Sequence, residues 1–211
     1  MAKIKLCGLT GIRDALYANE AMPDYVGFVF EKGRHFVSDR TAADMRRVLN
    51  PLIPAAGVFV RENPDHIRAL TEKGIIQIVQ LHGGETEDYI HKVRSMTGCP
   101  VIRAVSVSSS GDIASAQETE ADFLLLDHGR GGTGIAFDWS LIPPIRKPWF
   151  MAGGIGKGNV RQALSYGPYG VDIPRRPETD GRKVLLKLKD LVRIGLPESE
   201  GLLCITDSEL P

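Results

Sequence analysis

Two side chains in this sequence could form a proton-transfer pair, because each ends a strand-like apolar run. Cys7 ends the run that starts at Ile4, and Gly8 then opens a tight turn toward a predicted helix. A nearby helix N-terminus favours a thiolate, so Cys7 could act as a base or nucleophile near neutral pH. Asp127 ends the run that starts at Phe123, where desolvation could raise its pKa and make it a general acid. The alternative is structural: the thiol is simply buried and the carboxylate caps a loop.

Two glycine-rich segments, 131–134 and 153–158, could hold a phosphate group. Backbone N–H groups in such loops, next to a helix start, commonly bind phosphate. The second segment is not a Walker A loop, because Met151 replaces its first glycine, and it lacks the third glycine of a dinucleotide-binding loop. Tight turns without a ligand are the alternative. We take Gly132, Gly153 and Gly154 as candidate substrate-binding residues.

Other polar residues follow the predicted strands and complete the candidate site. They are Arg34, His35, Gln80, His82, Asp172, Arg175 and Arg176. The first two could recognise a carboxylate or could be solvated loop residues. The histidines have no metal-ligand spacing among themselves or with cysteine. We therefore expect neither a metal nor a cofactor.

Eight strand-like runs must position these residues. They span Ile4–Cys7, Tyr25–Phe30, Ala56–Val60, Ile76–Leu81, Val101–Val105, Phe123–Asp127, Trp149–Ala152 and Gly170–Ile173. The runs alternate with helix-like stretches, which include 14–20, 63–70, 85–96, 158–166 and 183–194. Buried strands alternating with helices indicate a parallel sheet, and eight units favour a closed (β/α)8 TIM barrel over an open doubly wound sheet. Functional side chains should then gather at the carboxyl ends of the strands.

Length and composition fit a single α/β domain. The 211 residues are 43% hydrophobic and 25% charged, and 26 basic residues balance 26 acidic ones, so we expect neither a nucleic-acid nor a membrane partner. Three scattered cysteines and the absence of a signal-peptide pattern indicate the cytoplasm. We expect residues 1–195 to form the barrel and residues 196–211 a tail. A monomer and a homodimer both remain open.

Taken in order, the segments at the strand ends resemble phosphoribosylanthranilate isomerase. They are Lys5-Leu-Cys7-Gly-Leu-Thr10, Gly27-Phe-Val-Phe30, Gly57-Val-Phe-Val60, Val79-Gln-Leu-His-Gly83, Leu125-Leu-Asp127, Gly131-Gly-Thr-Gly134 with Phe137-Asp-Trp139, Ala152-Gly-Gly154 with Asn159-Val160, and Gly170-Val-Asp172. These segments lie within a resemblance that runs from Lys3 to about Ile194. The number of segments in register makes the match specific.

The resemblance implies an enzyme of tryptophan biosynthesis that acts on a small phosphorylated substrate. It would convert N-(5-phosphoribosyl)anthranilate to 1-(2-carboxyphenylamino)-1-deoxyribulose 5-phosphate by an Amadori rearrangement. By this resemblance Asp127 would protonate the ribose ring oxygen, and Cys7 would remove the proton from C2′.

The chain departs from the family pattern in two loops. Residues 174–177 read Pro-Arg-Arg-Pro where the family has a Ser-Ser-Gly-Val segment that binds phosphate through backbone N–H groups. In the loop after the second strand, His35 stands where the family places an arginine, and Arg34 is one residue early. Two alternatives follow: a diverged isomerase that acts on another sugar derivative, or a catalytically silent binding protein.

Overall fold

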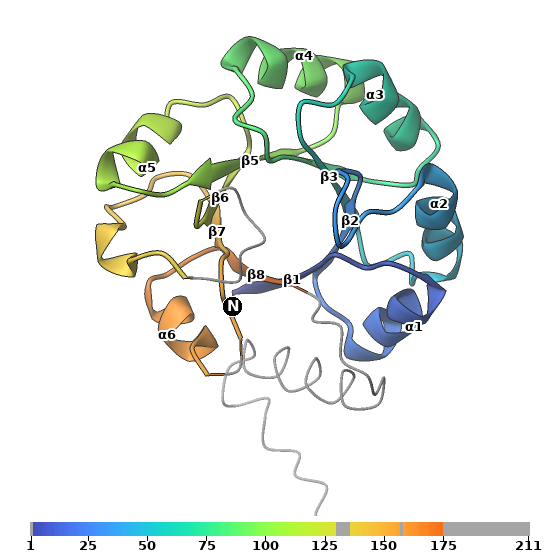
Figure 1. Ribbon diagram of the computed structural model, residues 1–211, viewed down its shortest axis with the longest axis horizontal. Coiled ribbons are helices and arrows are strands. Elements are labelled where there is room, and N and C mark those ends of the chain that lie inside the picture. The colour runs from blue at the N-terminus through green and yellow to red at the C-terminus, as the bar shows by residue number, and fades with distance from the viewer. Residues whose placement is uncertain (1, 130–135, 157, 175–211) are drawn as a thin grey trace, which may run out of the picture.

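Eight parallel strands form a closed barrel (Figure 1) in the computed structural model, which describes residues 2–129, 136–156 and 158–174. The strands are β1 (Lys3–Cys7), β2 (Tyr25–Val29), β3 (Ala55–Phe59), β4 (Ile78–Leu81), β5 (Val101–Ser106), β6 (Phe123–Asp127), β7 (Trp149–Met151) and β8 (Gly170–Pro174). Each strand pairs with the next, and β8 closes the ring by pairing with β1. The predicted (β/α)8 barrel is confirmed.

Helices surround the strands in the ring seen in Figure 1. They are α1 (Ile12–Ala21), α2 (Asp39–Val48), α3 (Pro64–Glu72), α4 (Glu87–Thr97), α5 (Ser110–Ala116) and α6 (Val160–Ser165). Local sequence explains their starts. Asn63 caps α3 by accepting from the Asp65 N–H, with Pro64 as the first helical residue, and Thr86 caps α4 in a similar way.

The connection between β6 and β7 departs from the predicted strand–helix repeat. Its described part holds only a short 3-10 helix, η1 (Trp139–Leu141), in place of an α-helix. Pro143 and Pro144 follow directly, and proline has no backbone N–H to continue a helix. The predicted helix at 183–194 and the tail at 196–211 lie outside the described residues.

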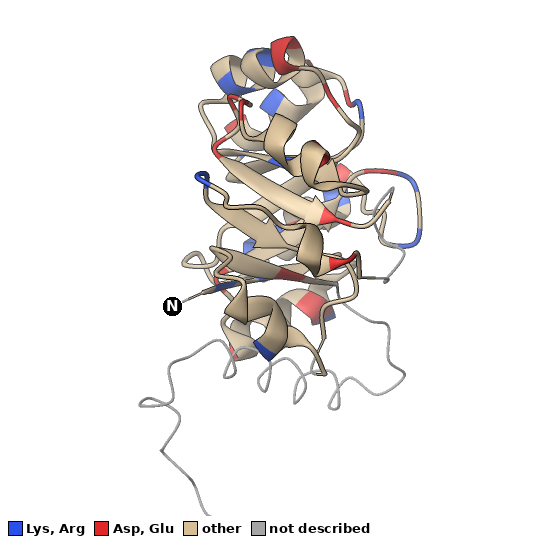
Figure 2. Cartoon of the chain, turned by 90° about the vertical axis from the view of Figure 1, so that its left-hand side faces the viewer, with Lys and Arg blue, Asp and Glu red and all other residues tan. Residues whose placement is uncertain are grey.

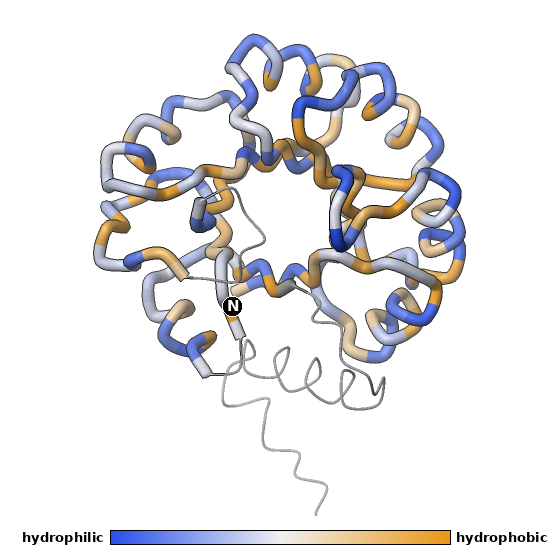
Figure 3. Tube along the Cα trace, viewed as in Figure 1, coloured by the Kyte–Doolittle hydropathy of each residue, from blue (hydrophilic) through white to orange (hydrophobic). Residues whose placement is uncertain are grey.

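Apolar side chains fill the barrel on both faces of the sheet. One cluster lies inside the barrel and consists of Ala56, Ile78, Ile102, Leu125, Phe150 and Ala152. Two larger clusters pack between the strands and the helices. In Figure 3 hydrophobic residues predominate along most of the strands, and hydrophilic residues are frequent on the helices and loops around them. Side chains alternate between the two faces of a strand. The inward side chains at the carboxyl ends of the strands therefore lie next to this apolar interior.

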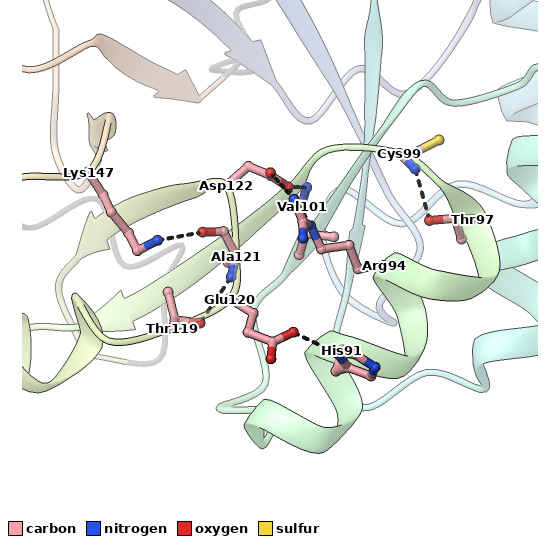
Figure 4. A network of polar contacts seen from close by, with 10 residues as sticks. All are labelled: His91, Arg94, Thr97, Cys99, Val101, Thr119, Glu120, Ala121, Asp122 and Lys147. Atoms are coloured by element: carbon pink, nitrogen blue, oxygen red, sulfur yellow. Dashed lines mark hydrogen bonds and ion pairs between the residues drawn. The ribbon is translucent and has the colours of Figure 1, made fainter.

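Polar contacts secure the amino-terminal end of the barrel, remote from the candidate site. In Figure 4, Arg94 of α4 donates to Asp122 just before β6, and the same carboxylate accepts from the Val101 N–H at the start of β5. His91 also contacts Glu120, at 2.7 Å. These contacts join a helix to the starts of two strands, which suits a structural role at this face.

Charged residues of both signs are scattered over the helices and loops in Figure 2, and the strands are mostly uncharged. No helix in the described ranges has the length and apolar character that crossing a membrane requires.

Phe150 should be a major contributor to stability. It is 1% exposed and packs edge-on against Tyr25 and Tyr169 inside the barrel. Phe150→Ala should lower the free energy of unfolding by about 3–5 kcal/mol, measured by urea denaturation, because it opens a cavity that the closed sheet cannot fill. Phe36→Ala removes the same atoms at a 47% exposed position and should cost about 1 kcal/mol or less. Equal losses would contradict the assignment of the core.

Candidate active site

A cavity of about 370 Å³ opens at the carboxyl ends of the strands. Nine of the twelve candidate residues line it: Cys7, Arg34, His35, Gln80, His82, Asp127, Gly153, Gly154 and Asp172. The other three, Gly132, Arg175 and Arg176, lie outside the described residues. The structure thus brings together every candidate that it describes.

Cys7 lies beside a buried ion pair. The Lys5 ammonium on β1 is 3.0 Å from Asp172 Oδ1 on β8, and the lysine side chain is 0% exposed. The same ammonium favours the Cys7 thiolate by its charge and by a hydrogen bond to the sulfur. Three polar groups are therefore coupled on two neighbouring strands.

The prediction that the Cys7 pKa is lowered is wrong. Burial, with a second contribution from the Asp172 carboxylate, raises the pKa of Cys7 to about 11. The Lys5 ammonium and a hydrogen bond from the Gly8 N–H act in the opposite direction but are outweighed. The helix α1 begins at Ile12, after the turn that follows Cys7. With this raised pKa, Cys7 is a thiol at neutral pH.

Two glycines leave room for the thiol and for the neighbouring loop. Gly27 of β2 is the register partner of Cys7, and a Cβ at this position would lie 2.6 Å from the Cys7 sulfur. Gly8 has a φ of +84°, and a Cβ there would lie 3.1 Å from Cγ of His35. Only glycine accommodates these close approaches, and at Gly8 also the left-handed backbone.

Asp127 enters the cavity from β6 with a partner on each oxygen. Oδ1 accepts from the His128 N–H at 2.7 Å, and Oδ2 is 3.7 Å from His82 Nε2. Burial raises the pKa of Asp127, although the His128 N–H and the His82 ring oppose this shift. The direction agrees with the prediction from its place at the rim of an apolar interior.

Gln80 orients the histidine that faces Asp127. Its Nε2 is 3.1 Å from His82 Nδ1. An amide nitrogen can only donate, so Nδ1 accepts and the ring hydrogen sits on Nε2, toward Asp127. Burial lowers the pKa of His82, which keeps the ring neutral.

The side-chain carbonyl oxygen of Gln80 accepts no hydrogen bond from the described residues. The side chain is 1% exposed, and its Oε1 has no hydrogen-bond partner among the described residues. Buried polar atoms without a partner are rare because they cost free energy. Since Gln80 lines the cavity, a ligand hydroxyl or N–H could satisfy this oxygen.

Two loops form the mouth of the cavity. Arg34 is exposed and His35 is half-buried in the loop after β2. Gly153 and Gly154 follow β7 with φ values of +79° and +66°. The second loop is braced by Asn159, whose side chain accepts from the Gly156 N–H and donates to the Gly154 carbonyl.

Sequence reasoning missed Lys5 as a residue of the site. A lysine in a strand that faces a closed barrel interior is itself a signal, since buried charges need partners. Its position two residues before Cys7 puts both side chains on one face of β1. Val58 and Val60 of the cavity wall were also missed, because apolar wall residues look like ordinary core.

These features together define a class of protein. A thiol and a carboxylic acid enter one cavity from β1 and β6, which are separated by two strands of the ring. No group of three or more His, Cys, Asp and Glu residues within the described ranges is arranged to hold a metal ion. The fold and the site are those of a (β/α)8-barrel enzyme with a cavity at the carboxyl ends of its strands.

Comparison with known proteins narrows this class. The sequence model of the N-(5'phosphoribosyl)anthranilate (PRA) isomerase family matches residues 4–193. The N-(5'-phosphoribosyl)anthranilate isomerase of Endomicrobium trichonymphae is 40% identical over 199 residues, 92% of this chain and 98% of that protein. The chain belongs to this family of isomerases.

Two solved structures resemble the chain throughout. One is a phosphoribosyl anthranilate isomerase in complex with reduced 1-(o-carboxyphenylamino)-1-deoxyribulose 5-phosphate; it is 32% identical, with a TM-score of 0.76 and coverage of 90% of this chain and 98% of that chain. The other shows monomers of the dimeric enzyme from Thermotoga maritima. It is also 32% identical, with a TM-score of 0.78 and coverage of 93% of this chain and 100% of that chain.

Gly27→Ala should displace the Cys7 thiol with little damage to the barrel. The added methyl group collides with the sulfur, and a shift of about 1 Å at a reacting group can cost about a hundredfold in rate. We expect kcat to fall at least tenfold in a steady-state assay with N-(5-phosphoribosyl)anthranilate. Gly11→Ala is the control, because a Cβ at Gly11 meets nothing within 4 Å. Equal activity of the two variants would show that the sulfur position is unimportant.

Proposed function

We propose that the chain converts N-(5-phosphoribosyl)anthranilate to 1-(2-carboxyphenylamino)-1-deoxyribulose 5-phosphate in tryptophan biosynthesis. The observation that carries this proposal is that Cys7, from β1, and Asp127, from β6, line one cavity. An Amadori rearrangement needs an acid at the ring oxygen and a base at C2′ of the same sugar. Membership of the isomerase family supports the same reaction.

The proposed steps use only these two side chains for proton transfer. The Asp127 carboxylic acid gives its proton to the ribose ring oxygen, and the bond between this oxygen and C1′ breaks to leave a protonated Schiff base. The Cys7 thiolate then takes the proton from C2′, and the electron pair moves to form an enolamine. Protonation at C1′ and loss of the proton from the C2′ hydroxyl give the ketone product.

Other cavity residues would bind the substrate. We assign the anthranilate carboxylate to Arg34 or His35 at the mouth and a substrate hydroxyl or N–H to the unpaired Gln80 oxygen. The phosphate would lie at Gly153 and Gly154. Gly132, Arg175 and Arg176 stay candidates for the same group, since arginine can hold a phosphate by paired hydrogen bonds.

The wider setting is also part of the proposal. The dimeric relative from Thermotoga maritima makes a homodimer an alternative to a monomer for this chain. We assign residues 1–195 to the catalytic domain, residues 196–211 to a tail, and the protein to the cytoplasm on its scattered cysteines.

Removing either proton-transfer group should abolish turnover. Cys7→Ser replaces the thiol with a hydroxyl of much higher pKa, and Asp127→Asn leaves no acidic proton. We expect kcat to fall by about a hundredfold or more in each variant, the size typical for general acid–base catalysis. Thr71→Ser, a change at a half-buried position on α3 that keeps the hydroxyl group, should keep full activity.

Three results of this assay would change the assignment. Ordinary activity in both variants would overturn the mechanism. An unmodified protein that ignores the anthranilate compound but isomerises another phosphorylated sugar would point to a diverged isomerase. A protein that turns over neither compound would point to a silent binding protein.

The pH profile should show that the working protonation state is a minor one. Burial raises the pKa of both groups, to about 11 for Cys7, and Asp127 stays the stronger acid. The dominant state with one proton on the pair is therefore carboxylate and thiol, whereas the reaction needs carboxylic acid and thiolate. Both states carry the same number of protons, so their ratio does not change with pH.

We therefore expect kcat/KM to rise with pH through the Asp127 pKa, to stay level near neutrality and to fall near pH 11. At low pH both groups are protonated and the base is lost; at high pH both are deprotonated and the acid is lost. Steady-state rates over a range of buffers give the profile. A fall in kcat/KM that begins below pH 8 would contradict the raised pKa of the thiol.

A further inference from the structure

Lys5 carries a charge at a fully buried position of β1, which is unfavourable for folding. Its side chain is 0% exposed within the barrel, and an ion taken out of water costs several kcal/mol unless it is well paired. Desolvation, the largest single effect, lowers the pKa of Lys5, but the Asp172 carboxylate and the Cys7 sulfur together raise it above its ordinary value. Lys5 therefore keeps its charge despite complete burial.

The barrel register explains why this charge meets Cys7. Lys5 and Asp172 are direct partners across the β1–β8 pair, and the next inward residue on β1 is Cys7 itself. The ammonium thus lies one inward position below the thiol, on the side of the apolar interior. Being fully buried, it is shielded from contact with a substrate in the cavity.

We propose that the Lys5–Asp172 ion pair positions Cys7 and sets how readily its thiol becomes a thiolate. This inference rests on the proposed role of Cys7 as the base, and it assigns both residues as positioning residues. Lys5 stabilises the thiolate by charge and by donating a hydrogen bond to sulfur, whereas Asp172 opposes it. Asp172 also holds the ammonium in place at 3.0 Å.

Other titratable groups face the same cavity. They are Glu31, Lys32, Arg34 and His35 from the loop after β2, His82 after β4, and Asp127 from β6. Asp172 and Lys5 are the charged groups with the largest effect of charge on the pKa of Cys7, and they act in opposite directions. Opposite changes at these two residues should therefore move the thiol in opposite directions.

Alkylation by iodoacetamide measures the thiolate of Cys7 without any substrate. The full-length protein is treated over a range of pH, and the tryptic peptide that carries Cys7 is quantified by mass spectrometry. Below the pKa the rate is proportional to the thiolate fraction, so one pKa unit changes it about tenfold. At pH 8 we expect Asp172→Asn to react about tenfold faster than the unmodified protein and Lys5→Met about tenfold slower.

Two further variants keep the test decisive. Lys5→Met alone leaves a buried carboxylate unpaired and can destabilise the fold, whereas removal of both partners of a buried pair is often tolerated. Lys5→Met in the Asp172→Asn background should therefore fold by circular dichroism and react about tenfold more slowly than Asp172→Asn alone. Lys3→Met is the matched control, since Lys3 lies on the same strand but pairs with Asp24 at the surface. It should leave the rate for Cys7 unchanged.

Equal rates for Asp172→Asn with and without Lys5 would overturn the proposal, as would an equal effect of Lys3→Met. In the turnover assay, loss of the buried ammonium should lower kcat and leave KM nearly unchanged, because Lys5 does not reach the substrate. Alkylation is independent of turnover. If the alkylation rates follow the expected order but the Cys7→Ser protein is active, the role of Cys7 as the base is wrong. The effect of the ion pair on the thiol would still stand.

Discussion

The site depends on a single constraint: charges inside a closed barrel must find partners there. The ring of eight strands leaves no edge, and its inward side chains meet an apolar interior that includes Leu125 and Phe150. Lys5 can remain charged in this place only because register puts Asp172 beside it, with 3.0 Å between ammonium and carboxylate. The pair in turn surrounds Cys7 with opposing charges. The reactivity of the thiol is therefore a property of the β1–β8 pairing.

Asp127, on the other half of the site, is also buried, but its side-chain neighbour is neutral. Burial keeps His82 neutral, and Gln80 fixes its ring so that Nε2–H faces Asp127. Asp127 is thus desolvated without a full positive charge next to it, and its pKa is raised. The two halves of the site differ in their surroundings: an ion pair lies beside Cys7, and two neutral side chains, Gln80 and His82, lie beside Asp127. Gln80 Oε1 is a buried acceptor without a hydrogen-bond partner among the described residues.

Sequence patterns predicted the strands well because apolar runs in a parallel barrel are continuous and their carboxyl ends share one face. Every candidate site residue that the structure describes, from Cys7 to Asp172, lines the cavity at that face. The sequence patterns did not predict properties that depend on which side chains lie next to each other on neighbouring strands. The lowered pKa predicted for Cys7 is wrong, because desolvation and Asp172 are visible only once β8 lies beside β1. The described part of the connection after β6 also departs from the strand–helix repeat, since it holds η1 before two prolines.

A crystal structure of this chain with reduced 1-(o-carboxyphenylamino)-1-deoxyribulose 5-phosphate is the most direct test of the central claim. The two proton-transfer groups must reach the sugar from separate sides. We predict that the Cys7 sulfur lies against C2′, that the Asp127 carboxyl lies across the sugar from it, and that the Lys5–Asp172 pair stays intact beneath the sulfur. An analogue bound with C2′ turned away from Cys7, or with both groups on one side of the sugar, would contradict this account.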